Sequence, residues 1–401
     1  MADPVRRILE ADAGRDPERL ALKYRRMRAD PFAFLRATAH LFYADLPDAA
    51  ALRRAPAAWC CGDLHLENFG SYKGDNRLVY FDINDFDEAL LAPATWDPLR
   101  LAASVLVARR TLGLDSQHAQ ALARLAVDTW AAALEDGHAR WVERDTATGP
   151  VAALLESLRH RTRVDHLDRR TTLGAKGRRR KLQTDGRHAL PASRADCERV
   201  LHFFERFAKS CERPEFFRAL DVARRVAGTA SLGVERYVVL VEGKGSPDGN
   251  YLIDLKAAHA SVLRRRSPCR QPSWTDEAAR VVALQQRMQA IPVAFLQPVR
   301  MDGKAFVMRG LQPSEDRVAL DRLAAGDLPD FVRTLSRCAA WAQLRSAGRQ
   351  GSASADELVD FGRRGKWRAG LVEAARALVE RTEAQWQRFV RACDEGAVAP
   401  L

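Results

Sequence analysis

The chain has 401 residues, which suits one large two-lobed unit or two to three domains, and 47% of them are hydrophobic. The 64 basic and 52 acidic side chains leave a net charge of +12, which favours anionic partners such as nucleotides, phosphorylated metabolites or nucleic acid. No run approaches the roughly 18 apolar residues of a membrane span, the N-terminus lacks the apolar core of an export signal, and the seven cysteines show no metal spacing, so we expect a cytoplasmic protein with reduced thiols.

The first half of the chain predicts helices interrupted by strands. Apolar residues recur close to helical spacing within residues 5–45, for example at Phe34, Leu35 and Leu41. Pro56 breaks this pattern, and we expect a short strand that runs into the loop CGDLHLENFG. The β-favouring residues of LVYFDI predict a further strand. Long amphipathic helices are then expected between Trp96 and about Glu156.

The second half predicts a small β region followed by helices. The Arg-rich segment 158–195 lacks apolar periodicity, so we expect a mobile or ligand-facing loop there, followed by the helix DCERVLHFFERFAKSC. The strands RYVVLVEG and NYLIDLKAA flank the turn KGSPDGN, and the strands AFLQPV and AFVMRGL flank the turn Asp302-Gly303. Between these two hairpins, TDEAARVVALQQRMQA predicts one helix. From Leu320 to the end the chain is again helical.

This order predicts an α+β fold with a segregated sheet and two lobes. We expect a helical lobe with acidic loops over residues 1–215, a small antiparallel β-rich lobe over 216–312, and further helices over 313–401. The last segment is expected to complete the helical lobe.

Acidic and amide side chains gather in CGDLHLENFG and FDINDFDEA, at or just after strand ends. A carboxylate such as Asp63 can accept a proton from an attacking hydroxyl, and the amide oxygen of Asn68 can bind Mg²⁺. A second carboxylate must reach the same ion from another segment, and Asp82 or Asp85 can supply it. The alternative is that these residues only cap turns, which their clustering makes a poor explanation.

His65, on the same loop, is a candidate catalytic base or metal ligand. No second histidine stands at ligand spacing, which argues against zinc. The alternative, which we favour, is that the ring holds the loop by packing and hydrogen bonding.

The β region carries a candidate phosphate-binding loop and a lysine. Backbone N–H groups in the turn GTASLG can approach phosphate oxygens because glycine has no Cβ, although an ordinary hairpin turn is the alternative. The candidate residues of this loop are Gly228, Thr229, Ala230, Ser231 and Gly233. Lys256 ends the otherwise apolar strand YLIDL and should face solvent or a ligand. Its alternative is an edge-strand lysine that hinders aggregation.

The two acidic segments resemble the catalytic and metal-binding loops of the aminoglycoside phosphotransferase and choline kinase branch of the protein-kinase-like fold. There, a Gly-Asp-x-His-x-x-Asn loop precedes a hydrophobic-Asp segment. This resemblance implies a catalytic Asp63 and a metal-binding Asn68. It also implies a metal-binding Asp82, with Asp85 as its alternative, and a buried Asp97 that braces the catalytic loop.

A second resemblance covers most of the chain. The motifs YRRMRADPFAFLRATA, CGDLHLENFG, FDINDFDEA and WDPLRLAAS resemble the uncharacterised bacterial family called domain of unknown function 2252, or DUF2252.

The kinase-like resemblance also assigns roles in the β region. Lys256 would hold nucleotide phosphates and pair with a helix residue, for which Glu277 is the candidate and Gln285 the alternative. The segment MRGLQP, which begins at Met308, would be the hinge whose backbone meets an adenine. The parts then stand in circularly permuted order, because the catalytic and metal loops precede the glycine loop, the lysine and the hinge. Surface termini make such a permutation tolerable. It requires Asp63, Asn68 and Asp82 to face Lys256.

We therefore expect an ATP- and Mg²⁺-dependent phosphotransferase that acts on the hydroxyl of a small molecule or a protein. The acceptor would be anionic if the Arg-rich residues 158–181 bind it, and the alternative is that these arginines are only solvated. A second interpretation is a nucleotide-binding pseudokinase or a nucleotidyl transferase. A third is a basic nucleic-acid-binding protein, against which stand the few aromatic residues and the lack of a recognisable helix-turn-helix or zinc module.

Overall fold

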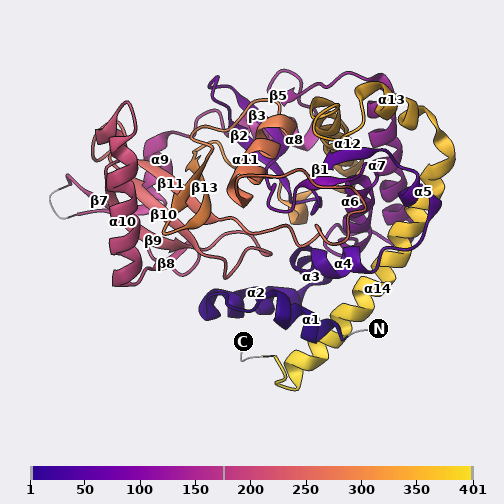
Figure 1. The fold of residues 1–401 in the computed structure, drawn as a ribbon, viewed down its shortest axis with the longest axis horizontal. Coiled ribbons are helices and arrows are strands. Elements are labelled where there is room, and N and C mark those ends of the chain that lie inside the picture. Colours follow the sequence, from indigo (N-terminus) through magenta and orange to yellow (C-terminus); the bar gives the residue numbers. More distant parts are fainter. Residues whose placement is uncertain (1–2, 175–176, 399–401) are drawn as a thin grey trace.

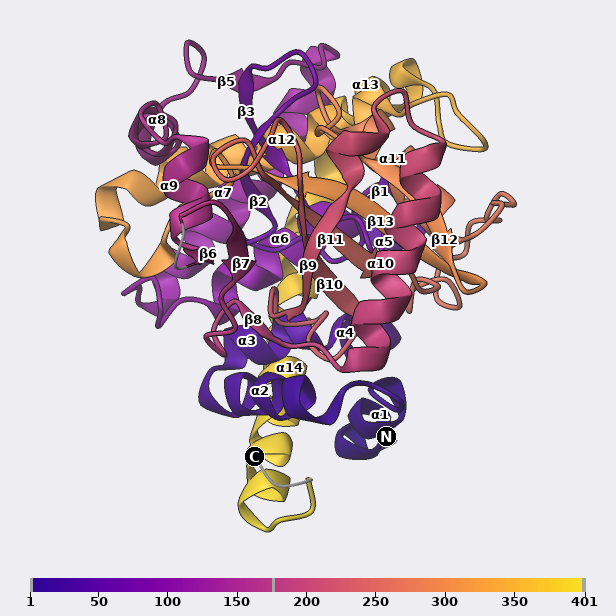
Figure 2. The ribbon, with the colours of Figure 1, turned by 90° about the vertical axis from the view of Figure 1, so that its left-hand side faces the viewer.

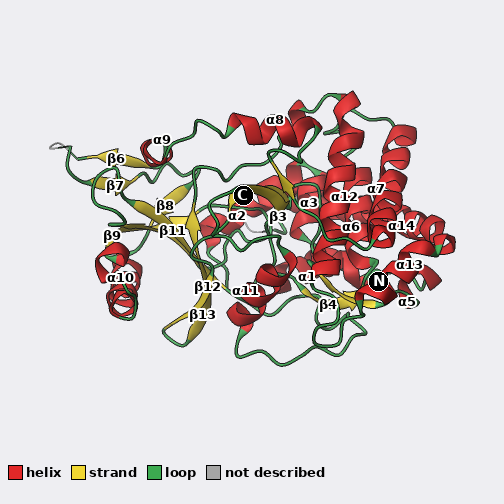
Figure 3. Ribbon diagram, turned by 90° about the horizontal axis from the view of Figure 1, so that it is seen from above, coloured by secondary structure: helices red, strands yellow, loops and turns green. Residues whose placement is uncertain are grey.

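The computed structural model describes residues 3–174 and 177–398, so residues 175 and 176 of the Arg-rich segment lie outside the described part. Helices make up 46% and strands 16% of the protein, which confirms the predicted α+β class. Figure 3 shows most strands gathered on one side and most helices on the other. We call these two parts the β lobe and the helical lobe.

The β lobe is built on a six-stranded antiparallel sheet in the order β12-β13-β11-β10-β9-β8. Its strands are β8 (Ala189–Pro191), β9 (Ala219–Arg225), β10 (Arg236–Val241), β11 (Tyr251–Ala257), β12 (Gln297–Met301) and β13 (Lys304–Leu311). Both predicted hairpins are present. The sheet already begins at β8, upstream of the expected lobe boundary at residue 216, because the short β8 pairs with β9.

The two faces of the sheet are covered differently. On the outer face lies α10 (Arg194–Lys209), which stands in front of the sheet in Figure 2 and packs Phe203 and Phe204 against residues such as Val239. Side chains alternate along a strand, so Val238 points to the opposite face, where it packs with Leu167 of the segment before β8. The predicted helix α11 (Glu277–Met288) is present and contacts β12, β13 and the helical lobe.

The segment expected to be irregular contains short elements. They are α9 (Arg163–Asp168), β6 (Thr171–Leu173) and β7 (Arg180–Leu182). The strands β6 and β7 form a hairpin of their own. We call residues 158–188 the insert, and it connects the helical lobe to β8.

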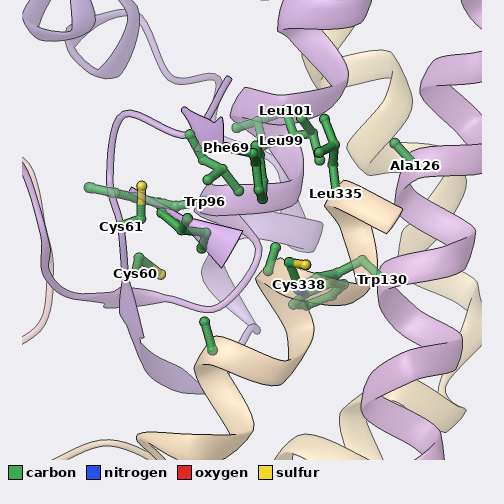
Figure 4. Close-up of a cluster of buried hydrophobic side chains, with 14 of the residues drawn as sticks. Cys60, Cys61, Phe69, Trp96, Leu99, Leu101, Ala126, Trp130, Leu335 and Cys338 are labelled. Carbon is green, nitrogen blue, oxygen red and sulfur yellow. The ribbon is translucent and has the colours of Figure 1, made fainter. Parts of the chain in front are cut away.

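The helical lobe surrounds α6, whose twelve residues are all buried. Its helices are α3 (Pro31–Ala37), α4 (Ala39–Ala44), α5 (Ala50–Arg53), α6 (Trp96–Val107), α7 (Ser116–Asp136), α8 (Gly149–Ser157), α12 (Leu328–Arg345), α13 (Ala355–Arg363) and α14 (Arg368–Asp394). Figure 4 shows Trp96 and Leu99 of α6 in the same apolar cluster as Trp130 of α7 and Leu335 of α12. This core gives the loops of the lobe a rigid base. Single 3₁₀ turns lie at η1 (Pro214–Phe217), η2 (Leu320–Arg322), η3 (Ala325–Asp327) and η4 (Gly365–Trp367).

Small strands in the helical lobe position the two acidic loops. They are β1 (Ala57–Cys60), β2 (Phe69–Lys73), β3 (Val79–Ile83), β4 (Leu90–Pro93) and β5 (Val142–Glu143). The pairs β1–β4 and β2–β3 hold both ends of the loop 61–68 and of the segment 84–89. Both acidic segments therefore leave the same small sheets and lie next to each other.

The N-terminal helices α1 (Pro4–Ala11) and α2 (Pro17–Ala29) reach both lobes. Each begins with an Asp-Pro pair, in which the aspartate caps the helix and the proline takes its first position. In α2, Met27 packs in a cluster with Phe389 of α14, whereas Leu22 packs against Leu232 of the β lobe. Figure 1 shows α2 below the gap between the sheet and the helices. In the described part of the chain, no helix combines the length and apolarity that crossing a membrane requires.

Candidate functional site

A cleft of about 1050 Å³ lies between the lobes. Its lining comes from the loop 61–68, the segment 84–88, the loop 227–234 and the strand residue Lys256. The structure therefore brings Asp63, Asn68 and Asp85 into one cavity with the predicted glycine loop and lysine, which lie far later in the chain.

Backbone contacts fix the first acidic loop. Gly62 has a φ of 86°, and a Cβ at this position would lie 2.5 Å from the Glu88 carbonyl oxygen, so glycine is required there. The buried Asp97 carboxylate of α6 accepts hydrogen bonds from the N–H groups of Cys61, at 2.9 Å, and Gly62, at 3.0 Å. Burial raises the pKa of Asp97 to about 7, and these two hydrogen bonds oppose the rise. Asp97 thus anchors the loop to the most buried helix.

Asp63 forms an ion pair with Arg100 of α6. The Arg100 Nη2 lies 2.7 Å and the Nε 3.0 Å from the Asp63 Oδ1, and Nη2 also donates to the Leu35 carbonyl oxygen at 2.6 Å. Burial raises the pKa of Asp63, and Arg100 opposes this rise. The pair holds the carboxylate in one orientation and limits the rise of its pKa, which stays above its usual value. Such a carboxylate can orient a hydroxyl and accept its proton.

Asn68 and His65 complete the loop. The Asn68 Nδ2 donates to the Asp63 carbonyl oxygen, so Oδ1 is the side-chain atom that can bind a cation. The His65 Nδ1 accepts from the Glu67 N–H at 3.2 Å, and its ring packs edge-on against Phe32. Burial, with nearby arginines, lowers the pKa of His65 well below its usual range, so the ring is neutral. These contacts match the loop-holding role that we favoured for His65.

Asp82 does not line the cleft, contrary to the expectation that it faces Lys256. It lies on β3, and its Oδ2 accepts from the Arg345 Nη2 of α12 at 2.9 Å and from the Ala290 N–H at 3.1 Å. The strand directs this side chain into the helical lobe, where a cation already neutralises it. The second candidate metal ligand is therefore Asp85, which follows the strand and lines the cleft.

Lys256 of β11 forms an ion pair with Asp87, which stands two residues after Asp85. Burial works to raise the pKa of Asp87, but Lys256 and Arg236 outweigh it and place the pKa below its usual range. Burial and the neighbouring Asp87 raise the pKa of Asp85. An Asp85 in this state gains from a bound cation, which would remove the cost of its negative charge.

Glu277 does not pair with Lys256. It occupies the first turn of α11, where its carboxylate binds the Arg280 Nε of the same helix at 2.5 Å. It also lies outside the lining of the cleft, whereas the alternative candidate Gln285 belongs to that lining. An acid in the first helical turn is stabilised by the helix dipole, which explains Glu277 without a functional role.

The glycine loop is held by α2 and by the turn that precedes it. Arg15 Nη1 donates to the Ala230 carbonyl oxygen at 2.5 Å, and Arg26 Nη1 donates to that of Gly228 at 2.7 Å. Among the residues that the structure describes, the N–H groups of Thr229, Ala230 and Ser231 have no protein acceptor. The loop therefore has N–H donors free for an anion in the cleft. The left-handed backbone at Gly228 and Gly233, with φ of 73° and 86°, allows this turn.

Met308 itself faces away from the cleft. Its side chain lies in the apolar core under α10, while its neighbours Val307 and Arg309 line the cleft, as the alternation of β13 requires. The chain crosses to the helical lobe just after β13, where the Gln312 Oε1 accepts from the Lys73 N–H at 2.6 Å and the Ser71 Oγ donates to the Ser314 carbonyl oxygen at 2.7 Å. The segment 312–316 thus connects the lobes after β13, as the insert does before β8.

The sequence interpretation missed a charged cluster on the sheet face beside Lys256. Arg225, Arg236 and Arg309 all form ion pairs with Asp254, with 2.6 Å from the Arg236 Nη2 and 3.3 Å from the Arg309 Nε. Asp254 is 1% exposed and precedes Lys256 by one strand period. A charged residue inside an apolar strand was the signal that identified Lys256, and the same signal marks these arginines.

The donor set fits Mg²⁺ better than a fully protein-bound metal. No group of three or more His, Cys, Asp or Glu side chains able to hold a metal occurs within residues 3–174 and 177–398. Mg²⁺ commonly binds through one or two carboxylates plus phosphate oxygens and water. Asn68 and Asp85 match such a partial set because both line the same cleft as the glycine loop and Lys256.

Comparison with known proteins yields one match. A family model described as "Uncharacterized protein conserved in bacteria (DUF2252)" matches residues 15–392. No curated protein and no solved structure gives a significant match.

Proposed function

This chain belongs to the DUF2252 family of bacterial proteins, and we propose that it is an ATP- and Mg²⁺-dependent phosphotransferase with a circularly permuted protein-kinase-like fold. The observation that carries the proposal is the ion pair of Lys256 with Asp87 in a cleft that Asp63, Asn68 and Asp85 also line. It joins a cation of the β lobe to carboxylates of the helical lobe, which is the combination that phosphoryl transfer needs.

Each group has a role in the proposal. Asp63, oriented by Arg100, positions the acceptor hydroxyl. Lys256 and the free N–H groups of the glycine loop hold the phosphates. Asn68 and Asp85 would hold Mg²⁺, which neutralises charge on phosphate oxygens when it is bound.

The order of the parts supports the permutation. The acidic loops at 61–68 and 84–88 come first in the chain, and the glycine loop, Lys256 and the connection at 312–316 follow them. The helices after this connection pack back onto those of the first half, since α12 contacts α7 and α14 contacts α6. One lobe is therefore assembled from both ends of the chain, as a permuted order of kinase parts would require.

Thermal denaturation with ATP, with and without Mg²⁺, tests the proposal on the wild type, Asp85→Asn and Asp75→Asn. Asp75 lies in the β2–β3 turn outside the cleft lining, so it controls for the same chemical change. We expect Mg²⁺-dependent stabilisation of the wild type and the control, of about 2.7 kcal/mol at ATP one hundred times above its dissociation constant, and its loss in Asp85→Asn. A wild type that ATP and Mg²⁺ do not stabilise would refute the proposal. The mass added to an acceptor distinguishes phosphate transfer from nucleotidyl transfer.

A further inference from the structure

One end of the cleft is crowded with arginines from two separate parts of the chain. The insert contributes residues from the turn after α9 and from the turn before β8, and the sheet contributes residues from three strands. These arginines are Arg169, Arg170, Arg187, Arg225, Arg236 and Arg309. Arg169, Arg170 and Arg225 also line a second, adjoining pocket, so these three side chains lie side by side.

The arginines of the insert lack carboxylate partners. Among the described residues, no ion pair involves Arg169, Arg170 or Arg187, although forty such pairs occur elsewhere in the molecule. Burial, together with neighbouring Arg169, acts to lower the pKa of Arg170. Arg169 and Arg170 thus lie close to each other without an ion-pair partner, and Glu315 and Asp185 offset only part of the effect on Arg170.

The arginines of the sheet are also incompletely neutralised. Arg225, Arg236 and Arg309 share the single carboxylate of Asp254. Of the other acids close to the six arginines, Asp185 already accepts from the His188 ring at 2.8 Å and from backbone N–H groups, and Glu315 has an oxygen without a hydrogen-bond partner in the described part of the protein. Six guanidinium groups thus face the carboxylates of Asp254, Asp185 and Glu315, while Asp85 and Asp87 also act on Arg309 and Arg236, so the arginines still outnumber the acids.

Guanidinium groups repel one another, so a partly buried cluster of this kind is favourable when an anion lies between its members. Arginine also presents a planar fork of N–H donors that matches two oxygens of a phosphate group. The arginine side chains themselves present only N–H donors, although apolar residues such as Val238 and Leu252 line the adjoining pocket. The chemistry of the cluster therefore selects oxyanions.

We propose that this end of the cleft is a phosphate-binding subsite, separate from Lys256, formed by Arg169 and Arg170 of the insert together with Arg225 and Arg309 of the sheet. Its place in a reaction rests on the proposed phosphotransferase function, but its ligand chemistry does not. The phosphate belongs either to an anionic acceptor or to the triphosphate of the nucleotide, and the two sources share this recognition.

Isothermal titration with inorganic pyrophosphate tests the subsite directly. The measurement uses a Lys256→Met background, so that binding at Lys256 does not contribute. The test variant is Arg169→Gln/Arg170→Gln, and its matched control is Arg178→Gln/Arg179→Gln, which makes the same charge change in the same insert outside the cleft lining. Because a hydrogen bond to a charged group stabilises by about 1.5–3 kcal/mol, we expect pyrophosphate affinity to fall roughly tenfold or more in the test variant and to be unchanged in the control.

A second variant keeps the test valid if the first variant fails to fold. Arg309→Gln leaves two guanidinium groups on Asp254, and we expect it to weaken pyrophosphate binding in the same direction. Pyrophosphate affinity equal to the control in both variants, or no binding in the Lys256→Met background, overturns the subsite.

Titration with ATP and adenosine identifies the source of the phosphate. A parallel loss of ATP affinity in Arg169→Gln/Arg170→Gln, without a change for adenosine, assigns the subsite to the nucleotide. Unchanged ATP affinity with weakened pyrophosphate binding assigns it to an anionic acceptor. Failure of the wild type to respond to ATP and Mg²⁺ would contradict the proposed function alone, because pyrophosphate binding is measured without either.

Discussion

The Lys256 ammonium group lies against the Asp87 carboxylate, although 169 positions separate the two residues in the chain. One residue belongs to the central region of the sheet and the other to the acidic segment of the helical lobe. Their contact joins the lobes across the cleft. It also means that any phosphate bound by Lys256 competes with Asp87 for the same ammonium group.

Because of this competition, substitutions of Lys256 and of Asp87 should differ in their effect on ATP affinity. Lys256→Met removes the cation that we propose to bind phosphate, and we expect ATP affinity to fall about tenfold, in line with the loss of one hydrogen bond to a charged group. Asp87→Asn removes the competitor, so ATP should bind at least as tightly as to the wild type. Calorimetric titration at constant Mg²⁺ measures both. Lys244→Met, in the exposed β10–β11 turn, is the control. Wild-type affinity in Lys256→Met would show that this lysine does not hold the nucleotide.

Substitutions of Asp82 and Asp85 should have different effects: the first should lower the stability of the protein, and the second should impair its response to ATP and Mg²⁺. Asp82 is buried and paired with Arg345, and removing one member of a buried pair costs about 3 kcal/mol or more. We expect Asp82→Asn to lower the free energy of unfolding by this amount in urea titrations, while the folded protein still responds to ATP and Mg²⁺. Asp85→Asn should retain or gain stability, because it removes repulsion from Asp87. Loss of the ATP and Mg²⁺ response in Asp82→Asn but not in Asp85→Asn would instead favour Asp82 as the metal ligand.

The sequence was sufficient to predict elements whose signals are local. The Asp302-Gly303 turn between two apolar strands is sufficient to predict a hairpin. Both residues have the left-handed backbone that such a turn requires. The same holds for the α+β order and for the acidic loops at strand ends. Lys256 could also be identified from the sequence, because a charged side chain in an apolar strand is expected to face solvent or a ligand.

Partners distant in the chain could not be predicted. Asp82 lies near the end of β3 and Asp85 just after it, and only Arg345, which is 263 positions from Asp82, shows which of them turns inward. Glu277 was paired with Lys256 because a helix carboxylate was expected, but Asp87 reaches the lysine from the other lobe. The arginine cluster was missed because its members come from the insert and three strands, and only the folded sheet brings them together.

Stability should depend on pH through Asp97. Burial raises the pKa of this carboxyl to about 7, above its value in the unfolded chain, so between about pH 4 and 7 the folded state keeps a proton that the unfolded state has lost. The contribution is fully present at low pH and is lost as the pH rises through 7. The free energy of unfolding should therefore fall with rising pH, by at most about 1.4 kcal/mol per unit for this group.

Urea unfolding of the wild type and Asp97→Asn at several pH values measures this contribution. The slope should be shallower in the variant, because asparagine does not titrate, and other groups cancel in the comparison. Glu88, whose pKa burial also raises to about 7, retains its own contribution in both proteins. Parallel curves for the two proteins would show that Asp97 keeps its charge in the folded state.

The N-terminal helices should control the order of the glycine loop. Arg15 and Arg26 donate to carbonyl oxygens of this loop, and the N–H of Asp16 donates to the Gly233 carbonyl oxygen at 2.9 Å. Arg15→Gln/Arg26→Gln removes the three side-chain hydrogen bonds to the loop but leaves the apolar packing of α2 intact. We expect faster amide hydrogen exchange over residues 227–234 and a several-fold loss of ATP affinity, because the free N–H groups are no longer held in place.

The control for the Arg15 and Arg26 contacts is Arg28→Gln, in the same helix as Arg26. Arg28 pairs with Asp394 of α14 at 2.6 Å, on the surface, and among the described residues it forms no hydrogen bond or ion pair with the loop. It should leave both exchange and affinity unchanged. If exchange over 227–234 rises in the double variant while ATP affinity stays constant, the loop does not bind the nucleotide. If exchange itself is unchanged, the order of the loop comes from its own turn, since Val234 and Leu232 already donate to carbonyl oxygens within it.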